Sequence, residues 1–364
     1  MPSFSMRKRV PFAAALTVLM AVGGGAPSTA LTSEEVARLA GPDRQKIIED
    51  GARKEGEVLW YTSLIVDQVI RPVVESFEKR YPGVALKFVR ADTAEILQRV
   101  MAEGRARSIR VDVIAVDGAE ALEKAGLTQP FESPIMAAYP THYIDKDKNW
   151  VSIRTSWQGI AWNTKLVSDV EAPRTWEALL DPKWKGKMAW GANTGAGAPR
   201  LITHLRKVWG EEKTKEYLLK LKAQDVRTLP GSIRTVLDQV IAGEKPLGLS
   251  MAMHHIAISK SSGAPIEGTS PEPVMARSGL INFVKGAPHP HAGMLLIDFM
   301  MAADGGQRVL RDAQYNPAHP GVPPLPELAW IQPNLNGKEE LMMPPDEEAE
   351  MSQSSNDLYK EIFR

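Results

Sequence analysis

The sequence predicts an α/β protein in which helices cover a doubly wound, mostly parallel sheet. Short apolar runs in the first third of the chain are bounded by glycine, proline or charged residues, as strands are. Segments with apolar residues at helical spacing separate these runs. Strand–helix alternation of this kind indicates a parallel sheet, whose ligands bind beyond the carboxyl ends of the strands. The length of 364 residues suggests about two domains.

The first third of the chain supplies the elements of this sheet. The predicted strands are residues 58–61, 84–89 and 111–116. Asp67 is expected to cap a helix that ends before Tyr81, where Pro and Gly follow. Asp92 and Glu95 have the spacing of a capping box at the start of the next helix.

The pattern continues through the rest of the chain. We expect strands at residues 150–164, 188–190, 246–251 and 280–284. The strand at 150–164 is expected to leave the first lobe, and the strand at 246–251 to end near His254 and His255. Ser232 and Pro290 begin predicted helices, and a short helix is expected at the carboxyl terminus.

The first thirty residues have the order of a secretory signal peptide. Arg7 opens a basic segment, residues 10–22 are apolar but too short to span a bilayer, and small residues lead to Ala30. We expect cleavage after Ala30 and a periplasmic location; the order argues against the alternative of a buried N-terminal helix. The chain has no cysteine, which excludes disulfides, thiolate metal ligands and an acylated N-terminal cysteine.

The charge pattern gives no sign of a polyanionic partner. Lysine and arginine number 44, as do aspartate and glutamate. A basic stripe or an aromatic-rich basic patch of the kind that binds nucleic acid is absent from the sequence.

Three segments carry a family resemblance. Residues 77–84 read Phe-Glu-Lys-Arg-Tyr-Pro-Gly-Val, residues 176–187 end in Leu-Leu-Asp-Pro-Lys-Trp-Lys-Gly-Lys, and residues 287–292 read Ala-Pro-His-Pro-His-Ala, with Asp298 and Phe299 following. In this order they resemble bacterial extracellular solute-binding proteins, in the branch that contains ferric-iron, 2-aminoethylphosphonate and sugar-phosphate binders.

The resemblance implies a type II-like periplasmic binding protein with two α/β lobes joined by crossover strands, which close on a ligand like a hinged clamp. It also implies an ABC transporter permease, with its ATPase, as partner. We expect lobe 1 to comprise residues 31–155 and 275–330, lobe 2 residues 156–274, and a tail of residues 331–364 to pack on the lobes. We expect a monomer.

Ligand-binding residues are expected first at the ends of the strands of lobe 1. Thr62 and Ser63 follow the first strand, Thr93 begins a helix, and Asp117 follows the third strand. The resemblance relates Asp117 to a carboxylate ligand of iron; a helix cap or a surface acid is the alternative. Gln158 lies in the crossover segment.

The second lobe offers two helix starts. Thr194, Gly195 and Ala196 precede a helix, where free N–H groups and small side chains favour an anion. The alternative is a glycine-rich turn without a ligand. Gly231 and Ser232 open another helix, although Ser232 also suits a simple capping role.

Two departures from the family bear on the ligand. Ferric binders of this branch carry adjacent tyrosines where this chain has Met253, His254 and His255, and their crossover arginines are replaced by residues such as Ser156 and Gln158. Ferric iron prefers oxygen donors, so direct binding of the bare ion is disfavoured. On a strand His254 and His255 would point to opposite faces. We expect His254 to donate a hydrogen bond to an organic anion and Met253 to form an apolar wall.

The preferred function is therefore a transport receptor for a small anion, namely a phosphonate, a phosphate ester or a carboxylate. A receptor for iron(III) or an iron complex is the alternative. A secreted enzyme is a third possibility, but the sequence contains neither a Gly-x-Ser-x-Gly elbow nor a His-Glu-x-x-His motif. We expect no cofactor, no resident metal and no nucleic-acid partner.

Overall fold

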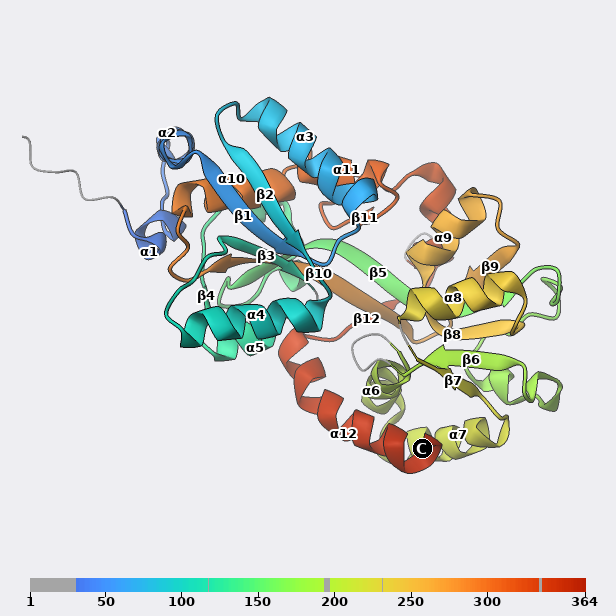
Figure 1. The fold of residues 1–364 in the computed structure, drawn as a ribbon. Helices are drawn as coiled ribbons and strands as arrows, with labels where there is room; N and C mark the ends of the chain where they lie inside the picture. The colour runs from blue at the N-terminus through green and yellow to red at the C-terminus, as the bar shows by residue number, and fades with distance from the viewer. Residues whose placement is uncertain (1–30, 117, 193–196, 231, 334–335) are drawn as a thin grey trace, which may run out of the picture. The chain divides into compact units, whose positions relative to one another are not determined.

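A mixed sheet runs through the residues that the computed structural model describes, which are 31–116, 118–192, 197–230, 232–333 and 336–364 (Figure 1). The strand order is β2-β1-β3-β10-β5-β8-β6-β7, and β4, β9, β11 and β12 pair beside this path. Parallel pairs lie at both ends of the order and antiparallel pairs in the middle. The expected parallel sheets are thus joined by an antiparallel centre.

The first parallel unit consists of the runs predicted as strands. β1 (Glu57–Thr62) pairs with both β2 (Ala85–Arg90) and β3 (Val113–Val116). Ile96 and Val100 of α4 (Thr93–Arg105) pack with Tyr61 and Ile114 in one apolar cluster. α10 (Pro290–Met301) contacts the sheet on the side opposite α4 (Figure 1) and packs on α2 (Arg44–Glu55).

The second parallel unit has the same layered arrangement. β6 (Met188–Gly191) pairs in parallel with β7 (Arg227–Leu229) and β8 (Leu247–Ala252). Trp162 packs with residues of α6 (Ala198–Trp209) and α7 (Glu211–Ala223), whereas its neighbour Ala161 packs with residues of α8 (Ile233–Ala242). Successive residues of a strand point to opposite faces, so two separate cores enclose this unit.

Two long strands connect the units. β5 (Trp150–Asn163) pairs with β10 (Val274–Val284) on the side of the first unit and with β8 and β9 (Ile266–Thr269) on the side of the second. We call β5 and β10 the crossover strands. β5 confirms the strand predicted at 150–164, whereas the prediction for 280–284 found only the end of β10. The missing part contains Arg277, Ser278 and Gly279, which do not read as a strand from their sequence.

The helix starts differ from prediction in detail. α3 (Arg71–Arg80) ends before Tyr81 as predicted, but a π-helical turn, η1 (Val66–Ile70), precedes it. Asp67 lies in this turn and forms an ion pair with Arg71 at 2.7 Å instead of capping a helix. Asp92 occupies the N-cap of α4, but its side chain makes no capping hydrogen bond, so the predicted capping box does not form.

Two residues predicted near a strand end lie in a helix. α9 (Met253–Ser261) begins directly after β8, so His254 and His255 occupy its first turn. The inference that they point to opposite faces of a strand is therefore wrong. Ser232 is the N-cap of α8, and its Oγ accepts a hydrogen bond from the backbone N–H of Thr235 at 3.3 Å.

The carboxyl-terminal segment packs along the second unit. α12 (Pro345–Phe363) is longer than the short helix predicted, and it contacts α6 and α7 (Figure 1). Tyr359 and Ile362 are buried there, and Glu348 forms an ion pair with Arg200 at 2.8 Å. Before this helix, β12 (Glu340–Met342) adds to the edge of β10.

Short elements complete the chain. They are α1 (Ser33–Ala37), α5 (Glu120–Lys124), β4 (Thr128–Gln129), η2 (Pro134–Ala138), η3 (Thr141–Tyr143), η4 (Glu177–Leu180), η5 (Pro182–Trp184), α11 (Gly306–Asp312), β11 (Asn316–Pro317) and η6 (Pro326–Ile331). Within the described ranges, none of the helices combines the length and the apolar character needed to cross a bilayer.

Candidate functional site

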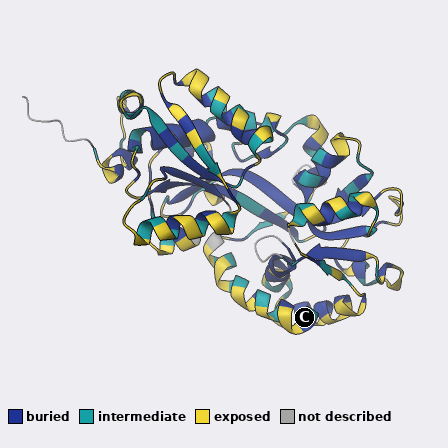
Figure 2. Ribbon diagram, in the orientation of Figure 1, coloured by how far each residue is buried: buried dark blue, intermediate teal, exposed yellow. Residues whose placement is uncertain are grey.

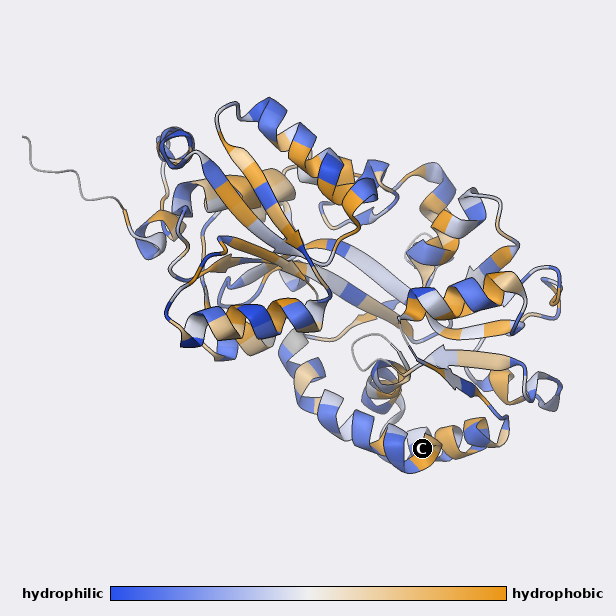
Figure 3. Cartoon of the chain, in the orientation of Figure 1, coloured by the Kyte–Doolittle hydropathy of each residue, from blue (hydrophilic) through white to orange (hydrophobic). Residues whose placement is uncertain are grey.

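The crossover strand β5 is buried but not apolar. Figure 2 shows β5 as buried along its length, whereas Figure 3 colours much of it pale or blue. Its central residues Arg154, Ser156 and Gln158 are each at most 8% exposed. Burying polar and charged groups costs free energy unless they find partners, so a polar run in a buried strand indicates a functional site.

Several of these side chains share one face of the crossover strands. Alternate residues of a strand point to the same side, so Arg154, Ser156 and Gln158 lie in one row. In the antiparallel pairing with β10, Gly279 lies opposite Arg154 and Arg277 lies opposite Ser156. Arg277 is therefore a diagonal neighbour of Arg154 on the same face, and diagonal neighbours of an antiparallel pair, about 7–8 Å apart, are within reach of long side chains.

Three rings lie beside this row. The ring centroids of His254 and His255 are 4.2 Å apart, and the His254 ring is 5.2 Å from that of Tyr315. The guanidinium carbon of Arg154 lies 5.5 Å from the centre of the Tyr315 ring. We call the following set the arginine–histidine cluster: Arg154, Arg277, His254, His255 and Tyr315.

The electrostatic environment of the two histidines is positive. Burial lowers the pKa of His254 well below its usual range, and the charges of His255, Arg154, Arg277 and Arg234 lower it further. Burial also lowers the pKa of His255, to about 4, with further contributions from Arg234 and Arg154. Both imidazoles are therefore neutral at pH 7, chiefly because they are desolvated, and the positive potential of the neighbouring guanidinium groups is one that attracts an anion.

The neutral imidazoles also offer hydrogen-bonding atoms. The Nδ1 atoms of His254 and His255 are buried and have no hydrogen-bond partner among the described residues. A neutral imidazole carries one N–H donor and one acceptor nitrogen. Two guanidinium groups and two such rings can together satisfy several oxygens of a small oxyanion, because guanidinium groups bind phosphate and carboxylate oxygens bidentately.

The predicted residues of the first unit meet at one edge of the sheet. The backbone N–H of Ser63 donates to the carbonyl of Ala115 at 3.3 Å, and that of Ala91 donates to the carbonyl of Thr62 at 3.3 Å. Thr62 is fully buried, and its hydroxyl accepts a hydrogen bond from the backbone N–H of Leu64 at 3.2 Å. Ser63 and Thr93 are partly exposed at this edge, so they are better placed than Thr62 to contact a ligand.

The predicted residues of the second unit divide into two groups. Gln158 belongs to the polar row, and Ser232 is an exposed helix cap. Met253 is 1% exposed and packs in a core cluster with Trp157 and Ala161, on the face opposite Gln158. The structure thus gives Met253 a packing role and does not bring it to the row. The following predicted residues lie outside the described residues: Asp117, Thr194, Gly195, Ala196 and Gly231.

The sequence reasoning missed the arginines of the cluster. The family resemblance places the crossover arginines at positions such as Ser156 and Gln158, whereas Arg154 lies one alternation earlier and Arg277 lies on the other strand. A usable signal was present, because residues 152–158 place five polar or charged residues inside an otherwise apolar strand. Tyr315 precedes a proline-rich segment and gave no comparable signal.

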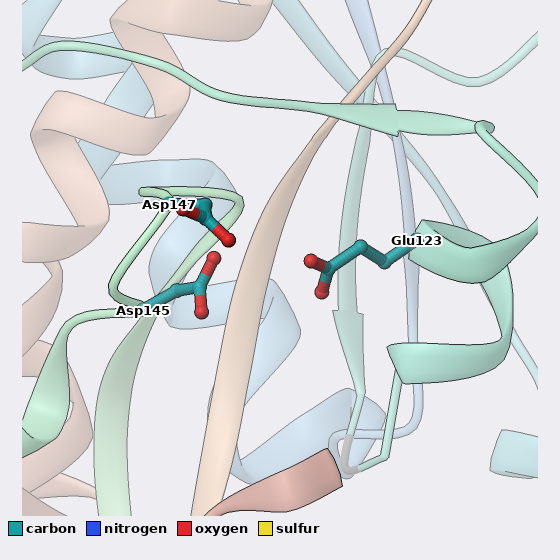
Figure 4. Close-up of side chains that lie close together, drawn as sticks. All are labelled: Glu123, Asp145 and Asp147. Atoms are coloured by element: carbon teal, nitrogen blue, oxygen red, sulfur yellow. The ribbon is translucent and has the colours of Figure 1, made fainter.

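A separate group of carboxylates lies away from this cluster. Glu123 of α5 faces Asp145 and Asp147, which come from one loop (Figure 4), and their ligand atoms all lie within 4.8 Å of one another. Burial raises the pKa of Glu123, and the negative charge of Asp145 raises it further. The side-chain amide of Asn149 donates to Glu123 at 2.9 Å and to Asp145 at 3.1 Å. This amide holds two of the carboxylates together, so their proximity does not by itself indicate a metal site.

Solved structures share this fold. A Trichodesmium protein in complex with iron and citrate ligands superposes with a TM-score of 0.70 at 19% identity, covering 85% of this chain and 99% of that chain. The periplasmic binding protein AfuA from Actinobacillus pleuropneumoniae, with fructose 6-phosphate bound, superposes with a TM-score of 0.69 at 20% identity, covering 84% and 98%. The class is thus the α/β fold of periplasmic binding proteins, which confirms the predicted fold class.

The family follows from the sequence comparison. Residues 112–332 match the family model of bacterial extracellular solute-binding proteins, and the chain belongs to this family. Iron uptake protein A2 of Synechocystis is 23% identical over 261 residues, which are 67% of this chain and 75% of that protein. A putative 2-aminoethylphosphonate-binding periplasmic protein of Salmonella typhi is 21% identical over 251 residues, 67% and 73% of the two chains.

Family membership fixes the general role. The chain is a non-enzymatic solute-binding protein of ABC import, from an extracellular or periplasmic family, and its partners are a small ligand and an ABC transporter. The sequence-based predictions of a solute-binding receptor and of a non-enzymatic protein are confirmed. The relatives' names differ in ligand, so the specific solute is a separate question.

Proposed function

We propose that this protein captures a small organic anion, namely a phosphonate, a phosphate ester or a carboxylate, and delivers it to an ABC transporter permease. The observation that carries the proposal is the pair of arginines on one face of the crossover strands, Arg154 and Arg277, next to two neutral histidines, of which His254 is buried and His255 half-buried. A negatively charged ligand gains Coulomb energy and hydrogen bonds in this position, whereas a cation meets repulsion.

The positive charges of the arginines also disfavour the alternative function, which is binding of iron(III). The positive potential at His254 opposes a bare ferric ion, and imidazole nitrogens are poorer ligands for this hard cation than phenolate or carboxylate oxygens. An iron complex with net negative charge, such as ferric citrate, is compatible with the cluster. The complex of the Trichodesmium protein with iron and citrate supports keeping this second candidate in the test.

Capture is proposed to occur by hinge closure about β5 and β10. The chain passes within β5 from the predicted lobe 1 (residues 31–155 and 275–330) to lobe 2 (residues 156–274), and it returns near the start of β10. The cluster contains side chains from β5, β10 and α9. A ligand that touches groups from both lobes stabilises the closed state selectively, because only a difference in affinity shifts the population. The other residues predicted to bind the ligand are proposed to approach it from the two lobes: Thr62, Ser63, Thr93, Asp117, Thr194, Gly195, Ala196, Gly231 and Ser232.

The solute is identified by a thermal-shift screen of the purified protein. The panel contains 2-aminoethylphosphonate, fructose 6-phosphate, citrate, ferric citrate and a ferric salt. A ligand at one hundred times its Kd stabilises the native state by about 2.7 kcal/mol, which raises the Tm of a chain of this size by about 4 °C. We expect at least one organic anion to produce this shift without iron.

Matched variants locate the binding site. Arg154→Ala combined with Arg277→Ala is expected to abolish the shift, whereas Lys213→Ala, a cation of α7 that lies over the Trp209 ring, retains it. A shift produced by ferric salts alone, or a full anion shift in the double variant, would refute the proposal. Consumption of the ligand during incubation would contradict a pure receptor.

Export is proposed to use residues 1–30 as a cleaved signal peptide. The basic start, the apolar centre and the small residues before Ala30 support this proposal. N-terminal sequencing of the protein recovered from a periplasmic extract tests it. The expected first residue is Leu31; an uncleaved chain in that fraction would contradict the assignment.

A further inference from the structure

Arg154 lies against a position that has no side chain. Its partner across the β5–β10 pairing is Gly279. A Cβ atom built on Gly279 would lie 2.5 Å from Nε, 2.6 Å from Cγ and 2.7 Å from Cζ of Arg154, and real Cβ atoms do not approach other atoms this closely. The Arg154 side chain therefore occupies the space that a side chain at residue 279 would take.

A ring covers Arg154 from another direction. The guanidinium carbon lies 5.5 Å from the centre of the Tyr315 ring, within the range of a cation–π contact. The residues that follow Tyr315 form β11, where Asn316 pairs with Thr155 and Pro317 with Arg154. Gly279 thus lies on one neighbour of β5 and Tyr315 directly precedes the other, and Arg154, at 8% exposure, is confined between the two residues.

We infer that Gly279 is a positioning residue for the ligand: by leaving its side-chain volume empty, it sets the place of the Arg154 guanidinium in the arginine–histidine cluster. This inference rests on the proposed function for its role in binding. An arginine that is already confined loses less conformational entropy when it binds an anion than one that moves freely. The glycine thereby contributes to affinity without touching the ligand.

The substitution Gly279→Ala separates positioning from folding. The backbone of Gly279 is outside the positive-φ region, so alanine introduces no backbone strain, and the atoms it meets belong to a long, flexible side chain. We expect the fold to be retained while the Arg154 guanidinium is displaced. A displaced charged hydrogen-bond donor weakens binding by about tenfold to a hundredfold.

The first measurement needs no ligand. Histidine ring resonances are followed by NMR as a function of pH in the wild-type protein, in Gly279→Ala and in Arg154→Ala. The charged groups that act on His255 are Arg234, Arg154 and Asp238, and those on His254 are His255, Arg154, Arg277 and Arg234. Moving the Arg154 charge away raises the pKa of His255 from about 4, in Gly279→Ala and in Arg154→Ala alike.

The second measurement is a double-mutant cycle on the affinity for 2-aminoethylphosphonate. If Gly279 acts through Arg154, Gly279→Ala weakens binding in the wild-type background and has no further effect in the Arg154→Ala background. Gly104→Ala is the matched control. Gly104 lies on α4, away from the cluster, and a Cβ atom built on it would lie 2.4 Å from Cδ2 of the Leu127 side chain. This control is expected to leave both measurements unchanged.

The outcomes distinguish the inference from the proposed function. An unchanged His255 pKa in Gly279→Ala, or an additive effect in the Arg154→Ala background, overturns the positioning role. Unchanged affinity in Arg154→Ala overturns the proposed anion site, whereas the NMR result still decides whether Gly279 positions Arg154.

Discussion

The two faces of the crossover strands carry polar residues in different settings. On one face Arg154, Ser156 and Gln158 lie beside Arg277 in the arginine–histidine cluster. On the other face Thr155 and Trp157 alternate with them.

Polar side chains on the second face form hydrogen bonds with other side chains of the protein. The Thr155 hydroxyl donates to the Tyr143 hydroxyl at 3.1 Å, and the Trp157 indole donates to the Glu340 carboxylate at 2.8 Å. Glu340 belongs to β12, which pairs with the edge of β10. These bonds join β5 to its own surroundings, so we expect them to contribute to stability.

Polarity alone does not identify the binding face of a strand. Both faces are polar in the sequence, and the difference lies in what surrounds each side chain. Around His254 the strongest charges are cations, and Nδ1 of its ring has no partner among the described residues. We therefore assign ligand binding to the first face and structural support to the second.

The largest expected effect comes from removing a charge on the first face. Arg277→Ala is expected to weaken binding of the anion found in the thermal-shift screen by about 2–5 kcal/mol, because this is the cost of removing one partner of a charge pair that ligand binding desolvates, here the pair of the half-buried Arg277 with the bound anion. Thr155→Val on the second face is the matched control, and we expect it to lower stability but to keep the affinity within about twofold. Isothermal titration calorimetry measures both. Equal losses of affinity in the two variants would remove the distinction between the faces.

The sequence predicted the local features of this fold better than the site. The strands of the first unit and the cap at Ser232 follow from residues that are close in the chain. The pairing of Arg154 with Gly279 joins positions more than one hundred residues apart, and only the register of two strands brings them together. The sequence predicts that His254 lies near the end of a strand, because the apolar run before it gives no sign that a helix begins at Met253.

The next largest expected effect is on folding stability, which depends on pH through the histidines beside the first face. The pKa of His255 is about 4 in the folded protein and 6.5 in an ordinary setting. Below pH 7 the unfolded chain therefore binds a proton that the folded chain does not, and folding stability falls as the pH falls toward 4. The contribution of this residue is about 2 kcal/mol between pH 7 and pH 5.

His255→Asn isolates this contribution. Urea unfolding at pH 7 and pH 5 is compared for the two proteins, and the variant is expected to lose less stability than the wild-type protein over this interval. The other buried histidines are present in both proteins and cancel in the comparison. Identical losses in the two proteins would show that His255 is not held neutral by its surroundings.

The smallest effects are expected for two adjacent residues on opposite faces of β5, one of which should affect stability and the other binding. Trp157→Phe keeps an aromatic ring in the second face but removes the hydrogen bond to Glu340, and we expect it to lower the free energy of unfolding by about 1–2 kcal/mol with unchanged affinity. Ser156→Ala, one residue earlier on the first face, is expected to change stability less than Trp157→Phe, because it removes only one hydroxyl from a buried position, and to weaken binding several-fold. Urea unfolding measures the free energy of unfolding of each variant, and calorimetry measures its affinity for the ligand. If Ser156→Ala destabilises the fold and Trp157→Phe weakens binding, the two faces have the opposite roles, because the residues alternate across the same strand.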